Sequence, residues 1–223
     1  MTHQNFQQAR ENMVVSQLQP SGIVSERIMA AYRAVPREMF VPNAMRGVSY
    51  LDDSIALGGG RSLMEPILFA FMLQNARLES GDKVLDIGCA SGYSSAVLAH
   101  LTDHVVALEQ EEKLLQNAND HWETLGILNK ISAIVGDHTD GYPEGSPYKA
   151  IFINGAVAEV PASLFKQLSD DGAIYTVLMS SGEQIGNVVS LRQDKSGFIE
   201  QTILGAGHTD YLIGFFPKKS FVF

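Results

Sequence analysis

The sequence predicts an α/β fold built on a doubly wound, mostly parallel β-sheet with helices on both faces. Residues 83–109 contain a short apolar run, a turn of small residues, a segment with helical apolar spacing and a second apolar run. That order is typical of a βαβ unit. Further apolar runs alternate with helical segments after this unit. With 223 residues, of which 45% are hydrophobic and 18% charged, the chain is long enough to bury a core of this kind.

A helical cap is predicted before the βαβ unit. Residues 5–45 carry apolar side chains at helical spacing, and Pro36 and Pro42 end the second helix. Residues 46–61 contain three consecutive glycines, Gly58 to Gly60, and are predicted to form either a loop close to a ligand or a plain flexible linker. Pro66 fits the first position of the next helix, because the N–H that proline lacks is not needed there.

The remaining elements follow in a regular order. We expect strand 83–87, helix 93–101, strand 105–108, helix 113–125, strand 131–135, strand 150–153, helix 161–168 and strand 173–178. Trp122 lies on the apolar face of its helix and is expected in the core. The stretches 187–191, 198–204 and 211–216 alternate in polarity, which predicts antiparallel strands that finish the sheet.

These elements predict a single domain over residues 1–223, because no linker rich in proline, glycine or serine divides the chain. It consists of a helical cap and loop (1–61), a cofactor-binding core (62–181) and C-terminal strands (182–223).

Charge and composition exclude several classes of function. The formal net charge is -9 and the basic residues are scattered, which argues against a nucleic-acid partner. The single cysteine, Cys89, excludes an internal disulfide framework, and the six histidines lack the spacing of a metal site. The polar start does not resemble a signal peptide, and no apolar run reaches the ~20 residues that cross a bilayer. We therefore expect a cytoplasmic protein with no membrane association.

The glycine-containing turn distinguishes between nucleotide cofactors. A dinucleotide fingerprint that began at Gly88 would need glycine at positions 90 and 93, where this chain has Ala90 and Tyr93. Asp86, just before the turn, would repel phosphates and suits a cationic or amine-bearing ligand. Glu109 ends the second strand, where an acid can accept the two ribose hydroxyls of an adenosine. The alternative is an ordinary glycine turn with no ligand.

Together these features resemble the class I S-adenosylmethionine-dependent methyltransferases, whose fold is Rossmann-like. The resemblance implies S-adenosyl-L-methionine as the cofactor. It places Asp86, Gly88, Ala90 and Gly92 beside the methionine part, Glu109 at the ribose, and Asp137 with His138 beside the adenine. Cys89 in the turn and Gln110 next to Glu109 complete the predicted cofactor-binding set.

A closer resemblance covers most of the chain. Its landmarks are, in order, VPREMFVP, the Tyr50-Leu51-Asp52 triplet, GGGRSLMEP, VLDIGCASGYSSAVLA, VGDHTDG, PYKAIFINGAVAEVP and QLSDDGAI. As an ordered set they are similar to those of the protein-L-isoaspartate O-methyltransferases. The family implies methyl transfer to a carboxylate of a damaged protein, a repair reaction. From about Gly182 onward we identify no landmark.

One segment departs from that family. The family carries Thr/Ser-Ile/Leu-Ser-Gln/Ala-Pro, and its second hydroxyl contacts the reacting carboxylate; this chain has Ser62-Leu63-Met64-Glu65-Pro66. Met64 therefore replaces the active-site serine and donates no hydrogen bond, while Glu65 adds a negative charge near the acceptor. Ser62, Met64 and Glu65 are the catalytic candidates, and their roles stay open.

The nature of the acceptor decides whether a base is needed. A carboxylate, with a pKa of about 4, is ionised at pH 7 and needs none. An amine or hydroxyl acceptor would need one, and Glu65 or His138 are the candidates. We therefore expect an O-methyltransferase that acts on a carboxylate of a protein, a peptide or a small molecule. The alternatives are a relative with another acceptor and a non-catalytic relative that only binds the cofactor.

Overall fold

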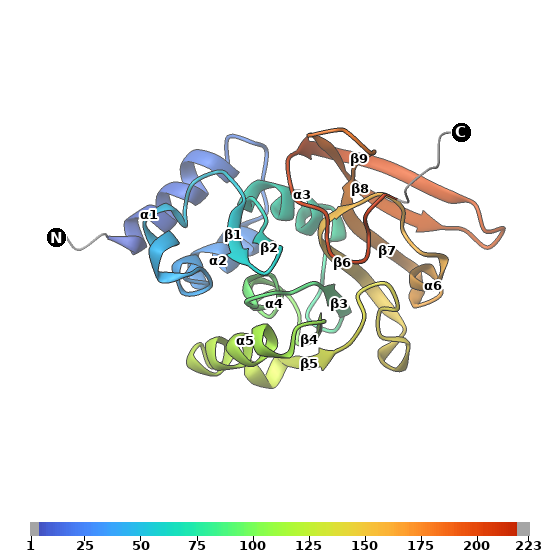
Figure 1. Ribbon diagram of the computed structural model, residues 1–223, viewed down its shortest axis with the longest axis horizontal. Coiled ribbons are helices and arrows are strands. Elements are labelled where there is room, and N and C mark those ends of the chain that lie inside the picture. The colour runs from blue at the N-terminus through green and yellow to red at the C-terminus, as the bar shows by residue number, and fades with distance from the viewer. Residues whose placement is uncertain (1–4, 218–223) are drawn as a thin grey trace.

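The computed structural model describes residues 5–217 and has a central seven-stranded sheet of order β5-β4-β3-β6-β7-β8-β9 (Figure 1). The strands are β3 (Lys83–Ile87), β4 (His104–Glu109), β5 (Ile131–Val135), β6 (Tyr148–Val157), β7 (Leu168–Leu178), β8 (Gly186–Gln193) and β9 (Ile199–Gly207). Pairing is parallel from β5 to β7, whereas β8 and β9 add antiparallel strands at the end of the sheet. The predicted α/β fold with antiparallel C-terminal strands is confirmed.

Helices cover the two faces of the sheet unequally. The helices are α1 (Phe6–Met13), continued by a π-helical turn Val14–Leu18, then α2 (Glu26–Ala34), α3 (Pro66–Ala76), α4 (Tyr93–Leu98), α5 (Glu112–Thr124) and α6 (Ala162–Phe165). The larger apolar core lies between α1–α5 and one face, and Trp122 is completely buried in it, as predicted. The other face packs against the short α6 and the segment after β9. Short 3₁₀ turns link these elements at Arg37–Met39, Asn43–Val48, Leu128–Lys130 and Pro143–Gly145.

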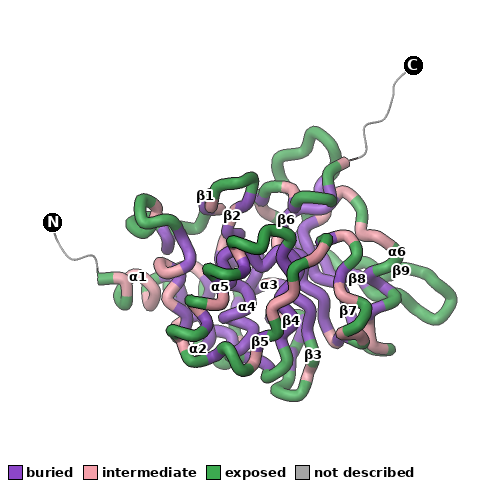
Figure 2. The backbone as a smooth tube through the Cα atoms, turned by 60° about the horizontal axis from the view of Figure 1, so that its bottom comes forward, coloured by how far each residue is buried: buried purple, intermediate pink, exposed green. Residues whose placement is uncertain are grey.

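Figure 2 shows how burial follows this layering, with the central strands buried and the tip of the β8–β9 hairpin exposed. Pro66 occupies the first helical position of α3, which confirms the prediction from the sequence. No helix among residues 5–217 is both long enough and apolar enough to cross a membrane.

The prediction of a loop over residues 46–61 is wrong in part. The region contains an antiparallel hairpin of β1 (Ile55–Gly58) and β2 (Arg61–Leu63). The three glycines that suggested a loop form its turn: Gly58, Gly59 and Gly60 all have positive φ, which reverses the chain within a few residues. The hairpin is separate from the seven-stranded sheet.

Two further elements differ from the prediction. The helix expected over 161–168 has only four residues, because the chain from Leu168 onward pairs with β6 as the start of β7. The strand expected over 211–216 does not form, and Gly214 has a φ of 98° that is incompatible with an extended strand. Instead, Tyr211 forms an isolated bridge with Ala156, at the carboxyl end of β6.

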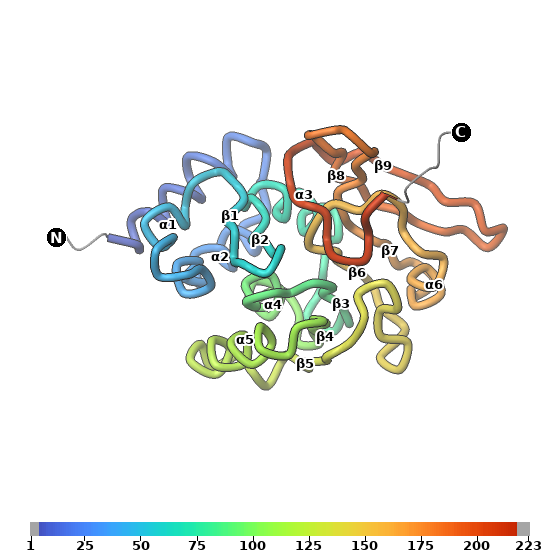
Figure 3. The backbone as a smooth tube through the Cα atoms, viewed as in Figure 1, coloured from blue at the N-terminus to red at the C-terminus, as the bar shows by residue number. Residues whose placement is uncertain are grey.

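The segment after β9 therefore has a different place in the fold from the one expected. Figure 3 shows it returning, in red, to the carboxyl ends of the central strands, opposite the β1–β2 hairpin. The backbone N–H of Leu212 donates to Ala156 at 3.0 Å, and that of Ala158 donates to Phe215 at 3.0 Å. The hairpin and this segment cover the edge of the sheet where the predicted site lies.

Candidate active site

The predicted site residues come together at the carboxyl edge of the parallel strands. Asp86 lies in β3, Glu109 ends β4, His138 follows β5 and Asn154 lies in β6. In open α/β sheets this edge is where ligands bind. Strands far apart in the sequence therefore supply polar groups to one place.

The turn between β3 and α4 adopts a left-handed conformation at three positions, which its glycines favour and Ala90 does not. Gly88, Ala90 and Gly92 all have positive φ. A Cβ on Gly92 would lie 2.7 Å from Nε1 of Trp122, so only glycine fits against α5 there. Cys89, between them, is buried, and burial together with the nearby carboxylates raises the pKa of its thiol well above the usual value. A thiol in this state is not a nucleophile.

Asp86 is fully buried and accepts three side-chain hydrogen bonds. Its Oδ2 accepts from the hydroxyls of Ser94, at 2.7 Å, and Ser95, and its Oδ1 accepts from Nδ2 of Asn154 at 2.6 Å. Burial raises the pKa of Asp86, and the hydrogen bonds partly offset that rise. Because its own oxygens are enclosed, Asp86 acts on the pocket through Ser94 and Asn154, which line it.

Glu109 is only 1% exposed and is surrounded by donors. Its Oε2 accepts from Nη2 of Arg61 at 2.7 Å and from the backbone N–H of Ala90 at 2.8 Å. Its Oε1 accepts from the backbone N–H of Gln110 at 3.0 Å and lies 3.4 Å from Nε2 of His138. Burial by itself would raise the pKa of Glu109, but the hydrogen bond with His138 and the charge of Arg61 hold it below the usual value.

The remaining cofactor candidates differ in how close they come to this cluster. His138 is buried, and its Nδ1 lies 3.2 Å from the carbonyl oxygen of Ile213 in the segment after β9. Asp137 is exposed and accepts from the N–H and hydroxyl of Thr139, which lowers the pKa of its carboxyl. Gln110 is exposed as well and contributes its backbone N–H to Glu109.

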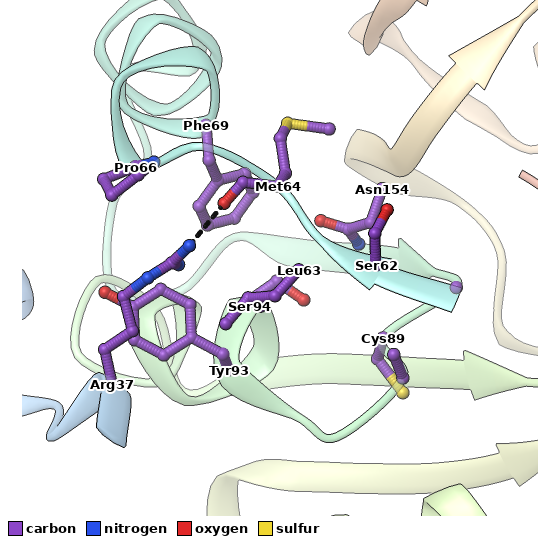
Figure 4. Close-up of a pocket in the computed structure, with 12 residues that line it drawn as sticks. Arg37, Ser62, Leu63, Met64, Pro66, Phe69, Cys89, Tyr93, Ser94 and Asn154 are labelled. Atoms are coloured by element: carbon purple, nitrogen blue, oxygen red, sulfur yellow. Dashed lines mark hydrogen bonds between the residues drawn. The ribbon is translucent and has the colours of Figure 1, made fainter. Parts of the chain in front are cut away.

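Beside the turn lies a small pocket with a cavity volume of about 20 Å³ (Figure 4). Its walls include Arg37, Ser62, Leu63, Met64, Pro66, Phe69, Tyr93 and Asn154. Met64 is buried in the wall, and its backbone carbonyl accepts from Nη2 of Arg37 at 2.8 Å, the dashed line in Figure 4. The hydroxyl of Tyr93 is buried without a hydrogen-bond partner. The pocket is therefore mostly apolar, with few donors.

Glu65 has a more peripheral position than Ser62 and Met64. It occupies the position before α3 without a capping hydrogen bond from its side chain, and it is not among the residues that line the pocket, although both its neighbours are. Partial burial and the negative charges of Asp52 and Asp53 raise the pKa of its carboxyl. Glu65 therefore lies close to two other carboxylates, those of Asp52 and Asp53, and next to residues that line the pocket.

Arg37, Arg61 and Leu212 belong to the site but were not predicted from the sequence. Arg37 and Arg61 were missed because their partners, Met64 and Glu109, lie 27 and 48 residues away in the chain. Leu212 was assigned to a strand, but its Cδ1 lies 2.7 Å from the place of a Cβ on Gly88, so it covers the turn. A basic residue directly after three glycines was the one local signal for Arg61.

No group of three or more potential metal ligands occurs within residues 5–217. The residues fit an adenosylmethionine better than a nucleotide with a pyrophosphate. Two carboxylates, Asp86 and Glu109, stand at the strand ends, and Tyr93 is fully buried at the position where a dinucleotide fingerprint needs glycine.

The parallel sheet, the glycine-containing turn and the carboxylates at the ends of β3 and β4 define a class I S-adenosylmethionine-dependent methyltransferase. Comparison with known families makes the assignment more specific. The family model for "Protein-L-isoaspartate(D-aspartate) O-methyltransferase (PCMT)" matches residues 9–205, and the chain belongs to this family. The match extends past Gly182, where our own comparison of landmarks ended.

Individual relatives agree with the family model. The chain is 35% identical to a protein-L-isoaspartate O-methyltransferase of Herpetosiphon aurantiacus over 89% of this chain and 87% of the relative. It is 32% identical to protein-L-isoaspartate O-methyltransferase 1 of Syntrophobacter fumaroxidans over 94% of this chain and 96% of the relative.

Solved structures share the fold. A protein-L-isoaspartate O-methyltransferase structure matches with a TM-score of 0.78 and 26% identity, covering 92% of this chain and 66% of that chain. A Plasmodium falciparum structure of a protein described in the same terms, in complex with S-adenosyl-L-homocysteine, matches with a TM-score of 0.76. It covers 94% of this chain and 99% of that chain at 18% identity, and shows the common fold.

Proposed function

We propose that this chain transfers a methyl group from S-adenosyl-L-methionine to an isoaspartyl carboxylate in a protein or peptide. Membership of the family supports this reaction, and so does the pair of buried carboxylates at the strand ends. The observation that carries the proposal is the position of the apolar pocket directly beside the turn between β3 and α4. We propose that the whole chain acts as one domain, with a cap over 1–61, a core over 62–181 and C-terminal strands over 182–223.

The chain's own residues would hold the donor and the acceptor in line. We propose that Glu109 accepts the ribose hydroxyls and that the Asp86 network presents Ser94 and Asn154 to the methionine part. His138 and Asp137 would flank the adenine, with Gly88, Cys89, Ala90, Gly92 and Gln110 lining the rest of the site. The apolar walls would exclude water from the reacting groups, which strengthens every electrostatic contact there.

When bound, the cofactor supplies a sulfonium-activated methyl group: a carboxylate oxygen bonds to its carbon while the carbon–sulfur bond breaks and leaves a neutral thioether. An isoaspartyl carboxylate is ionised at neutral pH, so no residue has to remove a proton. The chain therefore contributes positioning and a dry pocket rather than acid–base chemistry.

We propose further that Met64 occupies the position of the family's serine. The buried Met64 side chain offers no donor to an acceptor carboxylate, and this observation favours a second candidate function. In that function the protein binds the cofactor or methylates another acceptor, but does not act on isoaspartyl residues.

Two measurements test these proposals. Calorimetric titration with S-adenosyl-L-homocysteine should show binding, and no binding by protein that is folded would contradict both candidate functions. Methyl transfer to an isoaspartyl peptide then separates them, with Met64→Ser compared against the volume-conserving Met64→Leu. Activity of the wild type supports isoaspartyl methylation, whereas activity that appears only in Met64→Ser supports the second function.

A further inference from the structure

Arg61 donates a hydrogen bond to the carboxylate of Glu109, which is the group that we propose for the ribose hydroxyls. Its side chain is 3% exposed and donates to Oε2 of Glu109 at 2.7 Å. The same Nη2 lies 3.1 Å from the place of a Cβ on Gly88, so the guanidinium lies across the turn between β3 and α4. The route from the turn to Glu109 is therefore closed by a residue of the β1–β2 hairpin.

The carboxylate of Glu109 cannot accept hydrogen bonds from Arg61 and from both hydroxyls of a ribose at the same time. Its Oε2 already accepts from Arg61 and from the N–H of Ala90. Its Oε1 accepts from the N–H groups of Gln110 and Glu111 and lies 3.4 Å from Nε2 of His138. A diol that donates two hydrogen bonds has to replace one of these donors, and the three N–H groups belong to the backbone of the turn and of the chain directly after β4. Arg61 is the donor that can leave.

The ion pair is incomplete, which makes such an exchange feasible. A guanidinium can donate two parallel hydrogen bonds to a carboxylate, but only Nη2 of Arg61 contacts Glu109 and its buried Nε has no partner. Arg61 also lies in a two-stranded hairpin that is separate from the main sheet. A buried arginine with an unpartnered donor calls for an explanation, and an anionic ligand beside it would supply the missing partner.

The acceptor carboxylate is the anion best placed to receive Arg61. Ser62 and Leu63, which follow Arg61 directly in β2, line the apolar pocket. The cation that lines the wall itself, Arg37, already donates to the carbonyl oxygens of Ser49 and Met64. With Met64 in the wall, no hydroxyl at that position can bind the carboxylate.

We propose that Arg61 determines acceptor specificity by exchanging carboxylates: it holds Glu109 in the free protein and the acceptor carboxylate once the ribose has taken Glu109. The proposal rests on the proposed function, because it takes the acceptor to be a carboxylate. It has two consequences. The cofactor binds against the ion pair, so its affinity is reduced by the fraction of protein in which Arg61 is paired. The acceptor binds only after the cofactor.

The first experiment measures binding of S-adenosyl-L-homocysteine and of 5′-methylthioadenosine, which lacks the amino-acid part, to the wild type and to Arg61→Gln. Both ligands should bind the variant about tenfold more tightly or better, because the competing guanidinium is gone. Arg192→Gln, on the exposed end of β8, is the matched control and should leave both affinities unchanged. Unchanged or weaker binding of both ligands to Arg61→Gln would overturn the proposal.

The two ligands also distinguish between the possible carboxylates. If Arg61 served the carboxylate of the cofactor's methionine part, Arg61→Gln would bind S-adenosyl-L-homocysteine more weakly and 5′-methylthioadenosine more tightly. That result would overturn the assignment to the acceptor.

The second experiment measures binding of an isoaspartyl peptide to protein saturated with S-adenosyl-L-homocysteine. The wild type should bind the peptide only when it is saturated with S-adenosyl-L-homocysteine. Under the same conditions Arg61→Gln should bind it about tenfold more weakly or worse. Arg61→Lys should lie in between, because lysine keeps the positive charge but lacks the two parallel donors of the guanidinium. Opposite effects of one substitution on the two ligands are not expected from a purely structural arginine. Equal peptide binding by wild type and Arg61→Gln, or none by the loaded wild type, would overturn the exchange.

Neither experiment depends on turnover. Loss of the proposed function would show as absent methyl transfer by the wild type, whereas failure of the exchange would show in these binding constants. The unfolding midpoint of Arg61→Gln establishes that the variant is folded, and Arg61→Lys provides a second variant if it is not.

Discussion

The strand edge that we propose as the donor site and the pocket that we propose for the acceptor lie side by side but are held together differently. At the donor edge the two buried carboxylates of Asp86 and Glu109 each accept at least three hydrogen bonds. In the acceptor pocket the walls are mainly apolar, and the buried hydroxyl of Tyr93 has no partner. One region is a polar network and the other is a packed, mainly apolar surface.

The difference shows how the two halves of a transfer site are specified. A polar network selects a ligand by the number and direction of its donors, and it is costly when a member is unpaired. An apolar wall selects by shape and excludes water, and tolerates volume-conserving changes. The donor edge should therefore respond to changes of charge, and the pocket to changes of packing or of the group that holds its wall.

The largest effect should come from Arg37, which holds the pocket wall. The buried guanidinium donates to Ser49 and Met64 and lies 4.9 Å above the ring of Tyr93. Arg37→Ala should lower the free energy of unfolding by about 3 to 5 kcal/mol, through two unpaired carbonyls and a cavity. Urea denaturation measures this loss.

A matched control for this variant is Arg33→Ala. Arg33 forms an ion pair with Glu11 in which both side chains are more than one-third exposed, and exposed pairs of this kind contribute little to stability. If Arg37→Ala cost no more than Arg33→Ala, the wall would be held by packing alone.

A smaller effect is expected at the donor edge. Glu109→Ala should weaken S-adenosyl-L-homocysteine binding by about 1 to 3 kcal/mol, because charged hydrogen bonds to the ribose are lost. Calorimetric titration measures the change, and Glu123→Ala on the exposed side of α5 is the control. Unchanged affinity would mean that the network of Glu109 supports the fold and not the ribose.

The smallest effect concerns Glu65, at the boundary between the two regions. Burial and the charges of Asp52 and Asp53 raise the pKa of Glu65, so its carboxyl takes up a proton at a higher pH than an exposed glutamate does. As the pH falls through that raised pKa, the negative charge beside the pocket is lost. The KM for an isoaspartyl peptide should therefore fall by about two- to threefold, the weak effect typical of a partly exposed charge.

Glu65→Gln should remove this pH dependence. Glu79→Gln, a change at an exposed position after the end of α3, should keep it. Initial rates measured at several peptide concentrations between pH 5 and pH 8 provide the comparison. If the KM of wild type and of Glu65→Gln depended on pH in the same way, the charge of Glu65 would not affect binding of the acceptor.

Much of the fold was predictable because it depends on local patterns. The run from Lys83 to Glu109 predicted β3, α4 and β4 from apolar spacing and small residues in the turn, and Pro66 predicted the start of α3. The errors lie where tertiary contacts decide. The glycines of 58–60 turn a hairpin, Leu168 pairs with β6 instead of extending α6, and residues 211–216 cross the sheet edge instead of joining the sheet.

The site divides in the same way. The sequence by itself determined which residues stand at the strand ends, because the carboxyl ends of parallel strands meet at one edge of the sheet and Asp86, Glu109 and His138 each come at or near such an end. Only the tertiary structure decided what each of them touches. Arg61 reaches Glu109 and Leu212 covers Gly88 from distant parts of the chain. No periodicity encodes such contacts, since they form only when the hairpin and the last segment pack over the same edge.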